Sequence, residues 1–272
     1  MNKYAVIGNP IKHSKSPQIH LAFARQENVD IDYQRILADE ENFIQTVNNF
    51  FADGGKGLNI TVPFKLLAYQ HCAQLNEYAQ AAKAVNTLYL NENQQWVGAN
   101  TDGIGLLTDL KRNLDIELKN TNILILGAGG ATRGILLPLL HEQPRQIIIA
   151  NRTVEKALDL ASEFNQLGSI QGCGFDQLDN ISFDIVLNAT SASLDNSMPP
   201  IPDSVVNKHS ICYDLAYSNE PTAFITWAKQ LGVKRTYDGI GMLIEQAAES
   251  YYIWRKFRPN TEEVFKLLRQ NN

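Results

Sequence analysis

Short β-rich runs alternate with longer segments of helical spacing along almost the whole chain, and few folds accommodate such an alternation. Strands are expected at residues 4–7, 33–37, 57–62, 86–90, 123–126, 147–150, 184–188, 211–214 and 234–237. Pro17–Asn28 and Glu41–Phe51 are typical of the helices between them. The runs at 123–126 and 147–149 are continuously apolar, as are strands that helices cover on both faces. We therefore predict an α/β protein with largely parallel sheets.

Composition and charge exclude several classes of protein. The chain has 272 residues, of which 44% are hydrophobic and 19% charged, as in an ordinary folded protein of one or two domains. A formal net charge of -5 lacks the basic excess of a general nucleic-acid or membrane-surface binder. No apolar stretch approaches the length of a membrane span. We therefore expect neither nucleic acid nor membrane as a partner.

The cysteines and histidines indicate no metal site. Cys72, Cys173 and Cys212 are far apart and form no CxxC pair, so neither a zinc site nor a disulfide framework is predicted. The five histidines show no metal-ligand spacing. The N-terminal residues show no signal-peptide pattern. Together with the unpaired cysteines, this favours a reducing cytoplasm.

A glycine-rich loop gives the strongest local signal. Gly127-Ala128-Gly129-Gly130-Ala131-Thr132 follows an expected buried strand and precedes the helical run at 135–140. In a dinucleotide-binding fold, such a turn lets the backbone approach the pyrophosphate at the positive end of the next helix. Thr132 stands at the third glycine position, so a tight turn without a ligand is the alternative. The flanking strand and helix favour phosphate binding.

The next expected strand indicates which dinucleotide binds. Sites for NAD usually end this strand with an acid that binds the ribose 2′-hydroxyl. Here Asn151 replaces the acid, and Arg152 and Lys156 add positive charge that suits a 2′-phosphate. Ordinary surface charge at a helix start is the alternative, but NADP is favoured. Thr190, Leu215 and Gly239 follow later strands and are natural cofactor contacts.

The first half of the chain offers polar groups for a hydroxylated carboxylate substrate. Ser14 and Ser16 lie on a loop that leads into a helix. The expected strand 57–62 places Asn59 and Thr61 on one face. Lys65 follows that strand, and Asn86 and Asp102 add an amide and a carboxylate. An ordinary turn, a solvated lysine or a helix cap is the alternative for each residue taken singly.

Taken together, these motifs resemble those of the shikimate dehydrogenase family. SKSPQIH, GLNITVPFK, AVNTL, GANTDG, GAGGATRG, NRT, NATS and DGIGMLIEQA occur in the family's order from Gly8 to Ala247. The resemblance implies an N-terminal substrate domain (residues 1–101 plus 239–272) and a Rossmann-type NADP-binding domain (residues 102–238) that flank a cleft. It also implies the NADPH-dependent reduction of 3-dehydroshikimate to shikimate, in aromatic amino acid biosynthesis.

The resemblance also implies roles for individual residues. Lys65 and Asp102 would form the catalytic pair. The shikimate-binding residues would be Ser14, Ser16, Asn59, Thr61, Lys65, Asn86, Asp102, Tyr217 and Gln246. The predicted NADP-binding residues are Gly127, Ala128, Gly129, Gly130, Ala131, Thr132, Asn151, Arg152, Thr153, Lys156, Thr190, Leu215 and Gly239. Ala192-Ser193 departs from the family, which often has a glycine there, and Lys156 stands where an arginine often lies.

Three other functions remain as alternatives. A broader quinate/shikimate dehydrogenase would share the fold and accept NAD, which the missing acid at Asn151 disfavours. A folate-linked dehydrogenase would share the two-domain plan, but the SKSP loop counts against it. A redox-sensing NADP-binding regulator would have no need for both Lys65 and Asp102. A homodimer is left open, because the sequence does not determine the oligomeric state.

Overall fold

The computed structural model describes residues 1–195 and 197–270, and the chain divides into two compact units. Unit 1 comprises Met1–Gly105 and Leu243–Asn272, and unit 2 comprises Leu106–Met242. The chain crosses between the units twice, and at both points the boundary expected from the sequence lies a few residues before the observed one. Asp102 therefore belongs to unit 1, together with Lys65. Among the described helices, none has both the length and the apolar character needed to cross a membrane.

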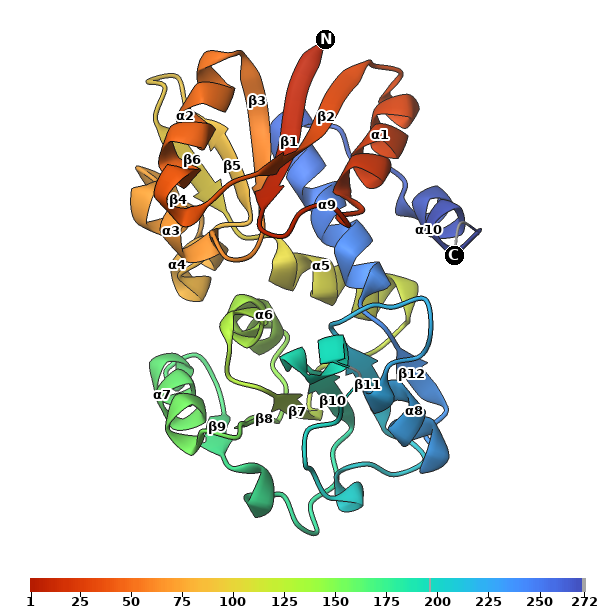
Figure 1. Ribbon diagram of the computed structural model, residues 1–272. Coiled ribbons are helices and arrows are strands. Elements are labelled where there is room, and N and C mark those ends of the chain that lie inside the picture. The colour runs from red at the N-terminus through yellow and green to blue at the C-terminus, as the bar shows by residue number, and fades with distance from the viewer. Residues whose placement is uncertain (196, 271–272) are drawn as a thin grey trace. The chain divides into compact units, whose positions relative to one another are not determined.

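Unit 1 is built on a six-stranded sheet with the strand order β2-β1-β3-β5-β6-β4 (Figure 1). The strands are β1 (Asn2–Gly8), β2 (Ile31–Leu37), β3 (Gly55–Ile60), β4 (Gln74–Leu75), β5 (Thr87–Leu90) and β6 (Trp96–Ala99). β5 runs antiparallel to β3 and β6, whereas β1 pairs in parallel with β2 and β3. The helices are α1 (Ser16–Glu27), α2 (Phe43–Ala52), α3 (Lys65–His71), α4 (Glu77–Ala82) and α10 (Thr261–Gln270). The chain passes between the units within α5 (Asp102–Thr108) and α9 (Ile240–Arg255).

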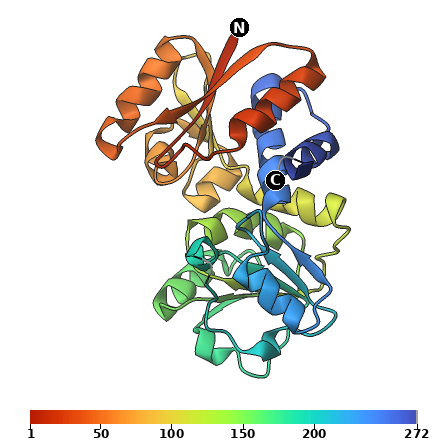
Figure 2. The same cartoon turned by 45° about the vertical axis from the view of Figure 1, so that its right-hand side comes forward.

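The two faces of this sheet have different neighbours because side chains alternate along each strand. Ala5 and Leu58 belong to the apolar core that α2, α3 and α4 complete. On the opposite face, Tyr4 stacks on Trp254 of α9 at a ring-centroid distance of 5.1 Å. Asn59 of β3 shares this second face and reaches α9 by a hydrogen bond. Figures 1 and 2 both show α1 and α9 beside each other on this side of the sheet.

Unit 2 is a six-stranded sheet whose described pairs are all parallel, in the order β12-β11-β10-β7-β8-β9. The strands are β7 (Asn122–Leu126), β8 (Gln146–Ala150), β9 (Ile170–Cys173), β10 (Ile185–Asn188), β11 (Ile211–Asp214) and β12 (Arg235–Tyr237). The main helices are α6 (Gly130–His141), α7 (Val154–Phe164) and α8 (Ala223–Gln230). Counted from β7, this is the Rossmann strand order. From β7 the chain first adds strands on one side and then returns to add β10 on the other, so the strand order reverses between β7 and β10. The two predicted α/β halves are confirmed.

Candidate active site

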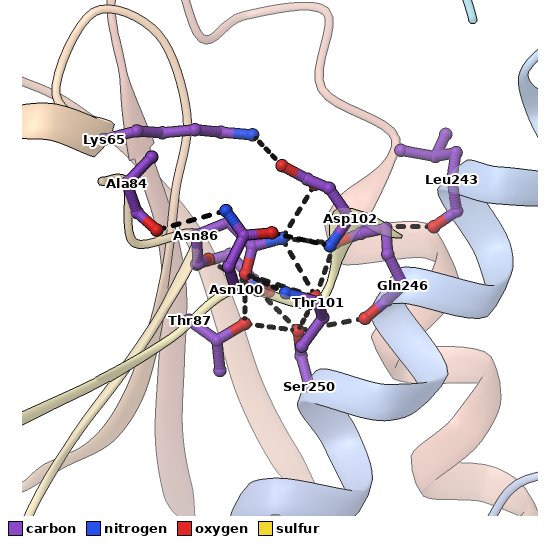
Figure 3. A network of polar contacts seen from close by, with 11 residues as sticks. Lys65, Ala84, Asn86, Thr87, Asn100, Thr101, Asp102, Leu243, Gln246 and Ser250 are labelled. Atoms are coloured by element: carbon purple, nitrogen blue, oxygen red, sulfur yellow. Dashed lines mark hydrogen bonds and ion pairs between the residues drawn. The ribbon is translucent and has the colours of Figure 1, made fainter. Parts of the chain in front are cut away.

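Lys65 and Asp102 form an ion pair in unit 1. Lys65 is the first residue of α3 and Asp102 the first residue of α5. The Lys65 Nζ donates to Asp102 Oδ2 at 2.7 Å, and the two side chains are 29% and 16% exposed. Figure 3 shows the two side chains extending toward each other from separate elements. A pair that is partly exposed in this way remains accessible to a small polar ligand.

The other oxygen of Asp102 is held by Asn86. The Asn86 side chain is 3% exposed, and its Nδ2 donates to Asp102 Oδ1 at 2.8 Å and to Thr101 Oγ1 at 2.9 Å. Its Oδ1 accepts from the Thr101 N–H at 2.9 Å, which fixes the orientation of the amide. The backbone N–H of Asp102 donates to Asn100 Oδ1 at 3.0 Å, where α5 begins. The carboxylate therefore has a distinct partner on each oxygen and a fixed backbone.

Behind this carboxylate lies a buried network of hydroxyls and amides (Figure 3). The fully buried Ser250 Oγ lies 2.7 Å from Thr87 Oγ1 and 3.2 Å from Thr101 Oγ1. It also accepts from Asn59 Nδ2 at 3.1 Å and donates to the Gln246 carbonyl at 3.0 Å. Thr87 and Thr101 stand in motifs quoted above, but neither they nor Ser250 were predicted as site residues.

Two predicted substrate ligands, Asn59 and Gln246, use their side chains in this network. Asn59 is 6% exposed and donates to the Asn86 carbonyl at 3.2 Å and to Ser250. The Gln246 Oε1 accepts from Asn86 and Thr101 at 3.4 Å each, and its Nε2 donates to the Leu243 carbonyl at 2.9 Å. Both residues are thus linked to Asp102 through Asn86, Asn59 by the Asn86 backbone carbonyl and Gln246 by the Asn86 side-chain amide.

The serine loop lies before α1. The Ser14 hydroxyl donates to Ser16 Oγ at 3.2 Å and accepts from the Ser16 N–H at 3.3 Å. Arg35 of β2 holds the loop, because its Nε and Nη2 donate to the Ser14 carbonyl at 3.0 and 2.6 Å. The two serine hydroxyls are therefore presented side by side on a fixed backbone.

Thr61 lies just beyond β3, so the expectation that the strand continues to Val62 was wrong. The chain turns there, and the Phe64 N–H donates to the Thr61 carbonyl at 3.0 Å. Pro63 has no N–H to continue the ladder. Thr61 packs tightly on Gly8, where an added Cβ would lie 2.4 Å from the threonine methyl. Only glycine at position 8 leaves room for Thr61 in this place.

The glycine loop of unit 2 has the form that a pyrophosphate site requires. Gly127 has φ +99°, and a Cβ there would lie 3.2 Å from the Ala189 carbonyl oxygen, so other residues would be strained. A Cβ added at Gly129 or Gly130 would meet no atom within 4 Å. Their backbone is therefore open to a ligand at the start of α6, where free N–H groups favour an anion.

Two predicted cofactor residues brace this loop. The fully buried Thr132 donates its hydroxyl to the Gly127 carbonyl at 2.7 Å. The Asn151 Oδ1 accepts from the Ala128 N–H at 3.2 Å, and its Nδ2 donates to the Thr153 carbonyl at 2.8 Å. Both side chains are thus used within the loop. Asn151 ties the end of β8 to the turn after β7.

Arg152 and Lys156 are exposed beyond the end of β8. The side chain of neither residue forms an ion pair or a hydrogen bond with another residue in the ranges 1–195 and 197–270. Arg152 precedes α7, and Lys156 lies in its first turn. Cations near a helix N-terminus are unfavourable without an anionic partner. The two residues are therefore available for an added phosphate group.

Further polar groups lie at the carboxyl ends of β10 and β11, beside the switch point of the sheet. Thr190 donates to Asn188 Oδ1 at 2.7 Å, and its methyl group packs over the Gly127 backbone. The Ser193 hydroxyl accepts from Asn188 Nδ2 at 2.9 Å and donates to Asp214 Oδ2 at 2.6 Å. Ser193, which departs from the family pattern, thus links the ends of two neighbouring strands.

Gly239 packs on the Leu215 carbonyl, where a Cβ would lie 2.0 Å from the oxygen, so these two cofactor residues are adjacent.

The predicted residues fall into two sets. Unit 1 contains the substrate residues Ser14, Ser16, Asn59, Thr61, Lys65, Asn86, Asp102 and Gln246. Unit 2 contains all the predicted cofactor residues and Tyr217, which is 37% exposed after β11.

Three family models match the chain. They are described as the shikimate dehydrogenase substrate binding domain (residues 6–88), shikimate / quinate 5-dehydrogenase (residues 109–198) and the shikimate 5′-dehydrogenase C-terminal domain (residues 239–269). A protein of Herminiimonas arsenicoxydans named shikimate dehydrogenase (NADP(+)) is 52% identical, over 98% of this chain and 97% of its own.

Solved structures agree with these matches over the full length. An Ael1 enzyme from Pseudomonas putida is 44% identical with a TM-score of 0.93, over 98% of each chain. Shikimate 5-dehydrogenase from Thermus thermophilus, in complex with NADP(H) and shikimate, is 28% identical with a TM-score of 0.88, over 100% of each chain. Both neighbours are similar in sequence as well as in fold.

Proposed function

This chain belongs to the shikimate dehydrogenase family, and on that premise we propose that it catalyses the reversible NADPH-dependent reduction of 3-dehydroshikimate to shikimate. This reaction is a step of the shikimate pathway, which supplies aromatic amino acid biosynthesis. The observation that carries the proposal is the partly exposed ion pair of Lys65 and Asp102, at 2.7 Å. A protein that only bound NADP would not need this pair.

Lys65 acts as the proton donor and charge stabiliser in this proposal. Reduction of a ring carbonyl places negative charge on its oxygen, and a proton must reach that oxygen. An ammonium group both stabilises the developing charge and supplies the proton. Lys65 suits this role because its Nζ contacts Asp102 while the side chain stays 29% exposed.

Asp102 orients Lys65 and accepts a hydrogen bond from a ring hydroxyl. Its Oδ2 holds the ammonium group, and its Oδ1 is held by Asn86. A carboxylate fixed at both oxygens keeps the lysine in one position, which favours proton transfer to a substrate bound in one orientation. Each carboxylate oxygen has further lone pairs for the hydroxyl.

The serine loop receives the substrate carboxylate in this proposal. Ser14 and Ser16 present two hydroxyls next to each other, and hydroxyls are good donors to a carboxylate. Thr61 and Gln246 supply further groups for the ring hydroxyls. Tyr217 of unit 2 remains a predicted partner of the carboxylate.

Unit 2 holds the cofactor. NADPH, when bound, supplies the hydride that reduces the ring carbonyl. The open backbone at Gly129 and Gly130 fits the pyrophosphate, and the unpaired charges of Arg152 and Lys156 fit the 2′-phosphate. A site for NAD usually has an acid where Asn151 stands.

The test is an absorbance assay of nicotinamide reduction with shikimate or quinate, each offered with NADP+ or NAD+. We expect rapid reduction of NADP+ by shikimate and slow reaction in the other three pairs. Comparable rates with quinate or NAD+ would assign the protein to the broader quinate/shikimate class. Tight NADP+ binding without turnover of any pair would refute the proposal in favour of a sensor.

A cytoplasmic location and a homodimer both stay predictions. The cysteines at positions 72, 173 and 212 are free, as is typical of proteins in a reducing compartment. Size-exclusion chromatography with light scattering would determine the oligomeric state.

A further inference from the structure

Tyr33 donates a hydrogen bond into the network behind Asp102, although no motif assigned it a role. It lies in β2 and is 6% exposed. Its hydroxyl donates to Asn59 Oδ1 at 2.7 Å. Asn59 in turn donates to the Asn86 carbonyl and to Ser250 Oγ. The buried phenol is therefore connected by two successive hydrogen bonds, through Asn59, to the residue whose amide holds Asp102.

The strand that carries this phenol also holds the serine loop. Burial raises the pKa of Tyr33 well above its usual value, while the Ser16 side chain and the nearby charge of Arg35 act in the opposite direction. Ser16 is hydrogen-bonded to Ser14, whose carbonyl accepts from Arg35. Tyr33 and Arg35 are two residues apart on one strand, so both side chains lie on the same face of β2. That face therefore carries both the phenol that donates to Asn59 and the arginine that holds the loop.

Packing fixes the ring of Tyr33 in this position. The His20 ring of α1 stacks on it with a centroid distance of 4.5 Å and an interplanar angle of 12°. His20 is fully buried and also lies against Phe23 and Trp254. The phenol therefore cannot swing away from Asn59 without disturbing the core between α1 and α9.

We infer that Tyr33 is a positioning residue for the substrate. Its hydroxyl fixes Asn59 and, through Asn59, the amide that orients Asp102. Arg35, on the same face of β2, fixes the serine loop that receives the substrate carboxylate. This inference rests on the proposed function. Because neither Asn59 nor the serine loop takes part in the chemical step, a shift of either changes the binding of ground state and transition state alike.

The test compares Tyr33→Phe with Tyr251→Phe in steady-state kinetics. Tyr251 is a matched control: it is also buried in unit 1, and its hydroxyl donates to Glu27 at 2.5 Å, outside the network. For Tyr33→Phe we expect KM for shikimate to rise about tenfold, the equivalent of one lost hydrogen bond, with kcat changed less than about threefold. KM for NADP+ should stay as in wild type, and Tyr251→Phe should leave all three constants unchanged.

Arg35→Ala supplies a second variant, because this exposed side chain can be removed without a cavity in the core. It releases the Ser14 carbonyl and should raise KM for shikimate in the same way. The inference is overturned if Tyr33→Phe folds and its KM for shikimate equals that of Tyr251→Phe. It is also overturned if Tyr33→Phe does not fold and Arg35→Ala has the wild-type KM. Absence of shikimate turnover in the wild-type protein would instead refute the proposed function.

Discussion

The side-chain amide of Asn86 donates to Asp102 Oδ1 over 2.8 Å, on the oxygen that Lys65 leaves free. The amide is neutral, so it orients the carboxylate without competing with the lysine for its charge. Its own position is fixed by Thr101, through the hydroxyl and the backbone N–H. The geometry of the ion pair therefore depends on a residue that takes no part in proton transfer.

Replacing Asn86 by alanine should lower kcat/KM for shikimate. The change leaves buried donors and acceptors unpaired at a cost of about 1–3 kcal/mol each, and it releases one oxygen of Asp102. We expect a loss of about tenfold to a hundredfold in steady-state assays. Asn49→Ala is the control, because Asn49 is exposed on α2 and its side chain accepts from the neighbouring Gln45, away from the ion pair. A wild-type value for Asn86→Ala would contradict the orienting role.

Replacing Lys65 by alanine should reduce turnover far more than shikimate affinity. Loss of a positioned proton donor typically costs about 10²- to 10⁴-fold in rate. Single-turnover kinetics and equilibrium binding of shikimate measure the two effects separately. Lys111→Ala breaks a comparable ion pair, with Glu142 at 2.6 Å, and should change neither. Near-normal turnover of Lys65→Ala would remove the lysine from the mechanism.

Replacing Arg152 by alanine should weaken NADP+ but not NAD+. A hydrogen bond to a charged group contributes about 1.5–3 kcal/mol, so we expect KM for NADP+ to rise about tenfold to a hundredfold. The rate with NAD+ should stay unchanged, because NAD+ has no 2′-phosphate. Arg145→Ala is the control, since this exposed arginine lies before the opposite end of β8. Equal losses with both cofactors would mean that Arg152 does not recognise the phosphate.

Replacing Tyr213 by phenylalanine should destabilise unit 2. The fully buried phenol donates to Asp109 Oδ2 at 2.7 Å and accepts from the Met242 N–H at 3.2 Å. Its loss leaves a buried carboxylate short of a donor, at a cost of about 1–3 kcal/mol. Urea unfolding followed by circular dichroism measures the change. The exposed Tyr252→Phe should leave the midpoint in place, and an unchanged midpoint for Tyr213→Phe would show that Asp109 does not depend on this phenol.

Acid should destabilise the fold through His20. Burial lowers the pKa of this histidine from 6.5 to about 3, so the unfolded chain binds a proton that the folded protein excludes. The contribution of the neutral His20 to the free energy of unfolding is fully present above about pH 6.5. It falls as the pH drops toward about 3, by up to about 1.4 kcal/mol per pH unit. Urea midpoints measured across this range should show a shallower pH dependence in His20→Gln than in wild type. His209→Ala, at an exposed histidine, should keep the wild-type slope, and an equal slope for His20→Gln would contradict the prediction.

The sequence by itself determined the α/β class, most strands and the glycine loop, because each depends on neighbouring residues. It did not reveal β6 and β9, which contain Gly98 and Gly172. Glycine lowers the strand signal. In β9 it is needed because a Cβ at Gly172 would lie 2.4 Å from the Ala157 backbone of α7. That close approach exists only once the helix has packed on the sheet.

The residues of the candidate site also fall into those that the sequence predicts and those that only the folded structure reveals. Lys65, Asn86 and Asp102 were predicted from local motifs, whereas Tyr33, Thr87 and Ser250 became visible only in the folded chain. Ser250 lies 163 positions after Thr87, and their hydroxyls meet at 2.7 Å because one side of α9 packs against the sheet face that carries Asn59. A serine or a tyrosine has the same chemistry everywhere in a sequence. Its hydrogen-bond partners are decided by which faces of distant helices and strands come together when the apolar core forms.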